Sequence, residues 1–270
     1  MEKSMKGSKV ETRQLVRELR KLKKVKAPSP LLPAVLMRTG LADASLHLGT
    51  PIGPMFVAYN KRGISAILRA EGFPEFQRFF RLRFGRPVYR VEKPPADLIR
   101  DVSLHLSGKR RSKLRFDLHS LSDFERSVLL KTLTIPRAEV RPYAWIAREI
   151  GNPGAVRAVG SVLAKNPIPL LIPCHRVTRS DGHIGAYGFG NEAKRAMLSA
   201  EGIDPDELER LADSGVRYYG SKTTHTFCFP TCRSAKRISD RHRIPFRSET
   251  EATHAGYRPC KICRPLPMSL

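Results

Sequence analysis

The sequence lacks any run of about 18 apolar residues, the length that a membrane-spanning helix needs. Residues 1–30 also lack the apolar core and the small-residue cleavage pattern of a secretory signal peptide. We therefore expect neither a membrane span nor export.

Acidic residues are scarce relative to basic ones. The 270 residues include 49 Lys and Arg but only 25 Asp and Glu, which gives a formal net charge of +24. A field of this size favours a polyanionic partner, with nucleic acid as the first expectation and an anionic membrane surface as the second. A charge that only aids solubility is the plain alternative. Residues 1–30 carry ten Lys and Arg against three Glu, so we interpret them as a basic disordered arm.

Cysteines are few, and their number, five, is odd. A secreted disulfide framework would have an even number in a shorter chain, so we expect a reducing compartment, the cytoplasm. Four of them form two close pairs, which can wrap a tetrahedral metal ion: Cys228, Cys232, Cys260 and Cys263. Four thiolates make zinc the default, although iron accepts the same ligand type. The alternative ligands are His225, His242 and His254.

The length predicts two domains and a small third unit, and 41% hydrophobic residues suffice for a core. Residues 31–116 indicate a small α+β unit. Apolar segments flank the turn at 60–63, residues 73–84 repeat aromatics at helical spacing, and residues 86–91 are strand-like. We expect a separate small module from Tyr218 onward, after a linker helix at 204–217.

The segment after residue 117 indicates helices. Ser122 is typical of a helix cap, before an apolar run that ends at 135–136. Residues 143–151 predict a short helix, and a second helix is expected to begin with Asn152 as its cap and Pro153 in its first turn. Such a pair forms a helix-turn-helix. Small residues would let the second helix enter a groove, and Arg157 would point outward; a solvated arginine in an ordinary helix pair is the alternative.

Residues 165–177 read KNPIPLLIPCHRV, so an apolar run, expected to be a buried strand, ends at Cys174 and His175. A thiolate is nucleophilic, and a nearby histidine lowers the pKa of a thiol. A catalytic cysteine, a structural core cysteine and a Cys–His hydrolase all fit this pattern. A glycine-rich loop at 178–190 follows, and then a helix that Asn191 caps and Gly202 ends.

The motif IPCHRV, with NPIP before it and SDGHIGAYGFG and LSAEG after it, resembles the O6-alkylguanine-DNA alkyltransferases. The resemblance includes RPYAWIAREIGNPGAVRAVG; it is strong over about 120–203 and weak over 50–116. It implies an α+β fold, with a ferredoxin- or RNase H-like subdomain at 31–116 and a helix-turn-helix alkyltransferase domain at 117–204. It also implies a monomer that repairs duplex DNA by moving a methyl or larger alkyl group from O6-alkylguanine, or O4-methylthymine, to its own cysteine.

The resemblance implies a role for individual residues. Cys174 would accept the alkyl group, His175 would take its proton through a water, Glu201 would orient the imidazole, and Asn166 would brace the turn. Minor-groove binding and base flipping would fall to these residues: Tyr143, Arg157, Gly154, Ala155 and Ala158. The base would be held by Pro173, Val177, Tyr187 and Gly188. The thioether product has no good leaving group, so we predict a single turnover. A silent lesion-binding protein is the alternative.

The segments TTHTFCFPTC and AGYRPCKICRP resemble the zinc module of Ada, which here would occupy 205–270 together with the linker helix. In that family the first cysteine of the C-x3-C pair accepts a methyl group from a DNA phosphotriester, and that position is Cys228. Positions near the phosphate-contacting surface are matched by Thr224, Arg233 and Arg258. A structural zinc that adds DNA affinity is the other interpretation.

Overall fold

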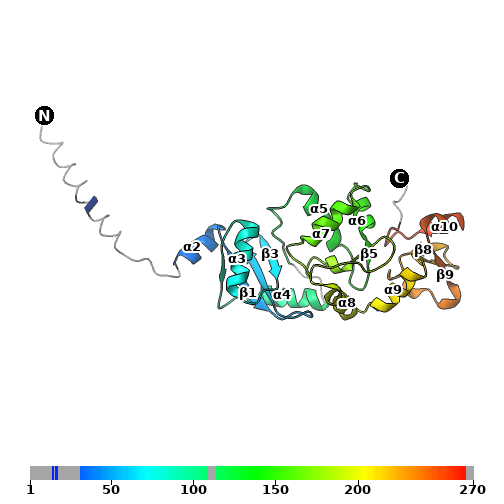
Figure 1. Cartoon of the computed structure of the whole chain (residues 1–270), viewed down its shortest axis with the longest axis horizontal. Helices are drawn as coiled ribbons and strands as arrows, with labels where there is room; N and C mark the ends of the chain where they lie inside the picture. The colour runs from blue at the N-terminus through cyan, green and yellow to red at the C-terminus, as the bar shows by residue number, and fades with distance from the viewer. Residues whose placement is uncertain (1–13, 15, 18–30, 109–113, 266–270) are drawn as a thin grey trace, which may run out of the picture. The chain divides into compact units, whose positions relative to one another are not determined.

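The computed structural model describes residues 14, 16–17, 31–108 and 114–265 (Figure 1). Nearly all of the predicted basic arm therefore lies outside the described residues and stays a prediction. The chain divides into two compact units, at 1–42 and 43–270. The described part of the first unit includes helix α2 (Leu31–Thr39). Each described helix is too short or too polar to span a bilayer.

The second unit begins with a four-stranded sheet in the order β3-β2-β1-β4. Its strands are β1 (Asp43–Leu48), β2 (Met55–Asn60), β3 (Gly63–Leu68) and β4 (Val88–Arg90). Helix α3 (Phe73–Phe84) packs Phe76 and Phe80 against this sheet, and α4 (Ala96–Ser107) follows. The predicted strand–turn–strand unit and aromatic helix are confirmed. Gly63 has a φ of 140°, and a side chain there would collide with the backbone of Arg115.

The middle of the unit is helical. Helix α5 (Asp123–Leu133) begins with the predicted Ser122 cap, and Glu125 completes a capping box. Helices α6 (Tyr143–Glu149) and α7 (Val156–Ala164) form the predicted helix pair, and α8 (Asn191–Ala200) follows. A short parallel pair, β5 (Arg141–Pro142) with β6 (Val177–Thr178), joins the two halves of this region.

Three local predictions need correction. Helix α7 begins at Val156 rather than near Asn152, because the Asn152 side chain donates back to the carbonyl of Ile150 instead of capping a helix. Gly190, with a φ of 90°, takes the cap position of α8, so Asn191 is already helical. The apolar segment 169–173 is buried as expected, but it forms a tight turn instead of a strand, with Leu170 at a φ of 72°.

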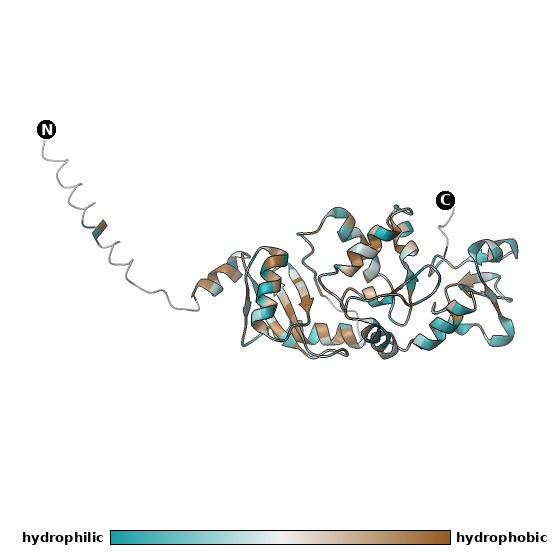
Figure 2. Cartoon of the chain, in the orientation of Figure 1, coloured by the Kyte–Doolittle hydropathy of each residue, from teal (hydrophilic) through white to brown (hydrophobic). Residues whose placement is uncertain are grey.

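Helix α9 (Pro205–Asp213) is capped by Asp204 and leads into the C-terminal module, whose sheet has the order β10-β8-β7-β9. Its elements are β7 (Tyr218–Ser221), β8 (Thr226–Cys228), β9 (Arg243–Phe246), α10 (Glu249–His254) and β10 (Arg258–Pro259). One hydrophobic core continues from β2 and β3 through α5–α7 into this module. In Figure 2 the N-terminal strands are largely brown, whereas α9 and α10 are largely teal.

Candidate functional site

The turn that carries Cys174 is built by the chain around it. The buried turn 169–172 leads into a single 3₁₀ turn, Cys174–Arg176. The Cys174 amide donates to the carbonyl of Ile172 at 2.8 Å, and the Arg176 amide donates to that of Pro173 at 2.9 Å. Only 7% of Cys174 is exposed. The thiol is therefore held in a fixed position and is almost inaccessible to solvent.

Asn166 closes this turn with its side chain. Its Nδ2 donates to the carbonyl of Ile172 at 2.9 Å and to Sγ of Cys174 at 3.1 Å, while its Oδ1 accepts from the amide of Ile168 at 3.0 Å. The predicted bracing contact is thus present in the geometry. A donor aimed at sulfur favours the thiolate over the thiol.

His175 and Glu201 form a buried pair beside the thiol. Nε2 of His175 lies 3.0 Å from Oε1 of Glu201. Arg176 donates to the same carboxylate, from Nη2 to Oε1 at 2.7 Å and from Nε to Oε2 at 2.8 Å. Burial alone would raise the pKa of Glu201, but the bonds from His175 and Arg176 outweigh it and lower the pKa to about 2. An ionised carboxylate only accepts, so Nε2 carries the proton.

That assignment leaves Nδ1 of His175 as a lone-pair acceptor. Among the described residues this buried atom has no hydrogen-bond partner. Burial lowers the pKa of His175, so the ring is neutral near pH 7. A neutral imidazole, oriented by a carboxylate and with one free nitrogen, is the arrangement of a general base.

The thiol is not ionised by its surroundings alone. Burial raises the pKa of Cys174, while the bond from Asn166 and the charge of Lys194 oppose that rise. Lys194 was not predicted from the sequence. It is fully buried, and its Nζ donates to the carbonyls of Val177 and Ile184 at 2.6 and 2.7 Å. Burial lowers its pKa to about 8. Its helical spacing from the apolar Met197 and Leu198 is the signal that could have shown its burial.

A cavity of about 370 Å³ adjoins Cys174. The sequence-predicted residues in its lining are Cys174, Asn166, Tyr187 and Gly188. The opposite wall comes from the N-terminal subdomain, through β3 and through Phe79 and Arg83 of α3, which the sequence did not predict. Pro173 and Val177 are buried and do not line the cavity.

Tyr187 closes one side of this cavity. Its ring meets that of His175 edge-on at 6.4 Å and that of Phe189 at 5.6 Å between centroids. Its hydroxyl is buried and makes no hydrogen bond of normal geometry with the described residues. Burial, together with its interaction with the Cys174 sulfur, raises the pKa of Tyr187, so the phenol stays protonated and its O–H can donate toward that sulfur or to a bound molecule.

The helix pair presents small residues to the outside. On α7 the buried face consists of Val159 and Leu163, whereas Arg157 and Ala158 are exposed. Gly154 is exposed and Ala155 half-buried in the preceding turn, and a Cβ added at Gly154 would meet no atom within 4 Å. The exposed face at 154–158 therefore has small side chains at Gly154, Ala155 and Ala158, and nothing packs against Gly154. Tyr143 is the first residue of α6, and burial, with the charge of a Cys174 thiolate, raises its pKa.

The remaining cysteines form one buried cluster. The sulfurs of Cys228, Cys232, Cys260 and Cys263 all lie within 4.8 Å of one another, and none is in a disulfide. Sulfurs around a zinc ion at about 2.3 Å would be about 3.8 Å apart, so the four fit a tetrahedral site. His225 and His254 are exposed, and the cluster contains no histidine. Four sulfurs this close would repel one another as thiolates unless a cation lay between them.

A second cavity, of about 400 Å³, opens onto Cys228 and Cys260. Hydroxyl side chains, two basic residues and one isoleucine complete its lining: Ser221, Thr223, Thr224, Thr226, Ser234, Ser239, Arg237, His242 and Ile238. Thr224 lines this cavity, while Arg233 and Arg258 are exposed outside the lining, and their contact with phosphate stays a prediction. A neutral, oxygen-rich ligand suits such a wall.

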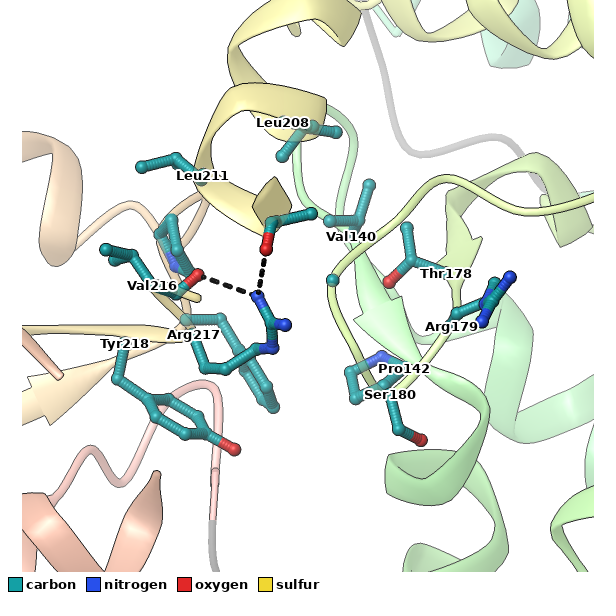
Figure 3. Close-up of a pocket in the computed structure, with 14 residues that line it drawn as sticks. Val140, Pro142, Thr178, Arg179, Ser180, Leu208, Leu211, Val216, Arg217 and Tyr218 are labelled. Atoms are coloured by element: carbon teal, nitrogen blue, oxygen red, sulfur yellow. Dashed lines mark hydrogen bonds between the residues drawn. The ribbon is translucent and has the colours of Figure 1, made fainter. Parts of the chain in front are cut away.

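A third, narrow crevice lies where the helical region meets α9 and β7 (Figure 3). Its side chains are mostly apolar, and Nη1 of Arg217 donates to the carbonyls of Ala212 and Val216 at 3.3 Å. Its volume is about 50 Å³, enough for a few water molecules. Neither Cys174 nor the cysteine cluster lines it, so it marks a domain junction.

Comparison with known proteins gives two family matches. Residues 123–203 match the model of the 6-O-methylguanine DNA methyltransferase, DNA binding domain, and residues 210–265 match that of the metal binding domain of Ada. A methylated-DNA–protein-cysteine methyltransferase of Methanosarcina barkeri is 35% identical over 157 residues, which are 56% of this chain and 92% of the relative.

A protein of the same name from Rattus norvegicus is 50% identical over 100 residues, 36% of this chain and 46% of its own length. Among solved structures, the Mycobacterium tuberculosis OGT in complex with DNA is 29% identical, with a TM-score of 0.49. That match covers 61% of this chain and 97% of the other.

Proposed function

The chain belongs to the methylated-DNA–protein-cysteine methyltransferases, and from that premise we propose that Cys174 takes the alkyl group from O6-alkylguanine in duplex DNA. The enzyme is a methylated-DNA–[protein]-cysteine S-methyltransferase of DNA repair. The observation that carries the assignment of the site is the fixed thiol of Cys174, at a cavity and beside a neutral, oriented imidazole.

The proton is moved by the buried pair. Nδ1 of His175 accepts the thiol proton through a water, while Glu201 stays ionised and keeps Nε2 protonated. The Asn166 donor and the Lys194 charge stabilise the thiolate as it forms. The pKa of Cys174 is raised by burial, so we infer that the thiol ionises only as it reacts.

The sulfur then attacks the alkyl carbon. The bond between sulfur and the alkyl carbon forms as the C–O6 bond breaks. The electron pair of the broken bond stays on guanine, which takes up a proton. The product is a thioether without a good leaving group, so each molecule acts once. The same attack on O4-methylthymine would form an S–C bond and break the C–O4 bond in the same way.

Contact with DNA falls to the open face of the helix pair. Gly154, Ala155 and Ala158 allow close approach in the minor groove, and Arg157 fills the space of an extruded nucleotide. Tyr143, at the start of α6, crowds the target nucleotide. Extrusion costs a few kcal/mol, and least for a damaged base that pairs poorly. We propose that one monomer engages one lesion; a cytoplasmic location stays a prediction.

A count of transferred label tests the assignment. Duplex DNA with one labelled O6-methylguanine is supplied in excess over the protein, and the label on the protein is located by peptide mass spectrometry. We expect at most one label per chain at Cys174 and none in Cys174→Ala. Binding without transfer would support a silent lesion-binding protein, and continued loss of lesions after each chain has reacted once would contradict the mechanism.

A second activity is favoured by the cavity over Cys228. The four cysteines would hold a zinc ion, and a zinc ion with four thiolates would have a net charge near −2, which would keep a ligand sulfur nucleophilic. A methyl phosphotriester is neutral, so this sulfur can approach its methyl carbon without repulsion from the phosphate. DNA that carries only labelled methyl phosphotriesters should then label Cys228 in the wild-type chain. Label that never maps to this cysteine would leave a structural zinc.

A further inference from the structure

The cysteine module, defined as residues 218–265, is hydrogen-bonded to the helical region at two junctions next to metal-ligand cysteines. An ion pair between Arg148 of α6 and Glu249 of α10, 3.8 Å apart, adds a further contact. We propose that metal binding in this module positions β5 and α6 of the alkyltransferase site, with Thr231 and Trp145 as the positioning residues. The inference rests on the proposed zinc site and on the proposed role of Tyr143, the first residue of α6.

The first junction lies beside Cys232. Thr231 Oγ1 accepts a hydrogen bond from the amide of Val140 at 2.9 Å, and the amide of Arg233 donates to Oε1 of Glu139 at 3.2 Å. Nζ of Lys236 donates to the carbonyl of Ala138 at 3.0 Å. Three bonds thus tie the loop of the C-x3-C pair to residues 138–140.

The second junction lies beside Cys263. Nε1 of Trp145, in the middle of α6, donates to the carbonyl of Cys263 at 3.0 Å, and Nη2 of Arg148 donates to that of Arg264 at 3.1 Å. Arg264 also pairs with Glu149. Trp145 is 4% exposed, so its indole N–H depends on this carbonyl for a partner. The loop of the C-x2-C pair is thereby fixed along one side of α6.

A buried ion pair lies between the two junctions. Arg141 and Glu139 are 2% and 3% exposed and are paired. The Arg141 guanidinium lies 5.2 Å from the ring of Phe229 and 5.8 Å from that of Trp145. Exposing or separating such a pair is costly. The module and the helical region therefore share a buried interface.

The path from this interface to the reacting sulfur is short. Val140 directly precedes β5, and Arg141 of β5 pairs with Val177 of β6, three residues after Cys174. The Val177 carbonyl also receives Nζ of Lys194. Movement of the Thr231 loop would therefore shift the strand that supports both the Cys174 turn and the buried lysine.

The metal decides whether these loops keep their geometry. Both junction loops are the turns that carry the ligand pairs, so their geometry depends directly on the four cysteines. The other large buried side chains of the module are Tyr218, Phe227, Phe229, Phe246 and Tyr257. Small modules of this kind fold when the metal binds and loosen when it is removed. We infer that loss of metal releases α6 at Trp145 and β5 at Val140 while the N-terminal sheet stays intact.

The full chain supplies its own reporter, because Trp145 is the single tryptophan of the sequence. Emission and amide hydrogen exchange are compared for zinc-loaded and chelator-treated protein. Without zinc we expect a red-shifted emission and faster exchange at 140–149, with β1–β3 unchanged. Equal emission and exchange in both forms would overturn the inference, and so would a uniform rise that includes β1–β3, because it would indicate general unfolding.

A matched pair of variants separates positioning from folding of the module. Thr231→Val removes the acceptor of the Val140 amide, whereas Thr253→Val removes a hydroxyl that bonds only within α10, to the carbonyl of Glu249. Both should keep one zinc per chain. Only Thr231→Val should speed exchange at Val140, by about 2- to 10-fold, and slow alkyl transfer. Equal behaviour of the two variants would contradict a role for Thr231.

Emission and exchange need no alkylated DNA, so the two proposals can fail separately. If amide exchange at 140–149 depends on zinc but no alkyl group is transferred, the proposed function is contradicted and the coupling is supported. If alkyl transfer to Cys174 is normal, and neither its rate nor the amide exchange at 140–149 changes when zinc is removed, the coupling is contradicted and the repair function is supported.

Discussion

Cysteine occurs in two different kinds of environment in this molecule. Cys174 stands alone, and its environment consists of an amide donor, a buried lysine and a neutral imidazole. The C-terminal cysteines instead share one small volume, where their sulfurs lie within 4.8 Å of one another. The first site controls a thiol through surrounding side chains, and the second through charge that a metal ion would balance.

The contrast teaches what each site depends on. Around Cys174 each contact comes from a different part of the chain, so the geometry of the site depends on the packing of the whole domain. The cluster draws its four sulfurs from two short turns, and a bound metal ion would be the main source of its order. Removing the metal should therefore affect the two sites unequally.

The largest expected effect is that of metal removal on the cysteine module. Apparent binding energies of structural zinc are about 10–16 kcal/mol in small modules, so chelation should unfold residues 218–265. Cys174 should still react with a small alkylating reagent, because its partners Asn166, His175 and Lys194 lie outside the module. Peptide mapping after chelation checks both statements. Loss of Cys174 reactivity equal to that of the module would erase the distinction between the sites.

The next effect concerns the carboxylate of the buried pair. Glu201→Gln replaces an acceptor by an amide that no longer fixes the tautomer of His175, and it leaves Arg176 without its charge partner. Alkyl transfer should slow by about 10²- to 10⁴-fold, the usual share of a general base. Glu209→Gln is the matched control, since Glu209 pairs with His183 away from the cavity. Equal rates for the two variants would remove Glu201 from the mechanism.

Local sequence patterns predicted much of this architecture. The Ser122 cap, the aromatic helix α3, and the cysteine pairs all depend on residues close in the chain. Where two local signals competed, the prediction failed: the Asn152-Pro153 pair is typical of a helix start, yet Asn152 bonds backward and α7 begins later. Helix boundaries are decided by such small differences.

The parts that could not be predicted are contacts between distant segments. Lys194 lies on an apolar face of α8, and its role depends on carbonyls of a strand and a loop that precede it. The wall that Phe79 and Arg83 contribute to the cavity comes from a subdomain about 90 residues away from Cys174 in the chain. The bond from Trp145 to Cys263 spans 118 residues. Residue spacing carries no information on such pairs.

A smaller effect is the acid dependence of stability. The ordinary pKa of Glu201 is 4.5, and in the fold it is lowered to about 2. The unfolded chain therefore takes up a proton below pH 4.5, whereas the folded chain does not until about pH 2, so stability is lost as pH falls through this window. The full contribution is about 3 kcal/mol. Urea unfolding between pH 6 and 3 should show this loss, and Glu201→Gln should show a flatter profile.

The smallest expected effect tests whether charge assists the isolated thiol. Lys194→Met keeps the length of the side chain and removes its charge, so transfer at pH 7 should slow by about tenfold, as for one lost electrostatic contact. In the wild type the same assistance should fade as pH rises through about 8, where Lys194 loses its proton. Lys61→Met, in the exposed β2–β3 turn, is the control. If Lys194→Met slows transfer at pH 7 and pH 9 by the same factor, the lysine acts through its bonds to Val177 and Ile184 rather than through its charge. The Cys174 site would then depend on packing geometry, whereas the cysteine cluster would depend on the charge of a metal ion.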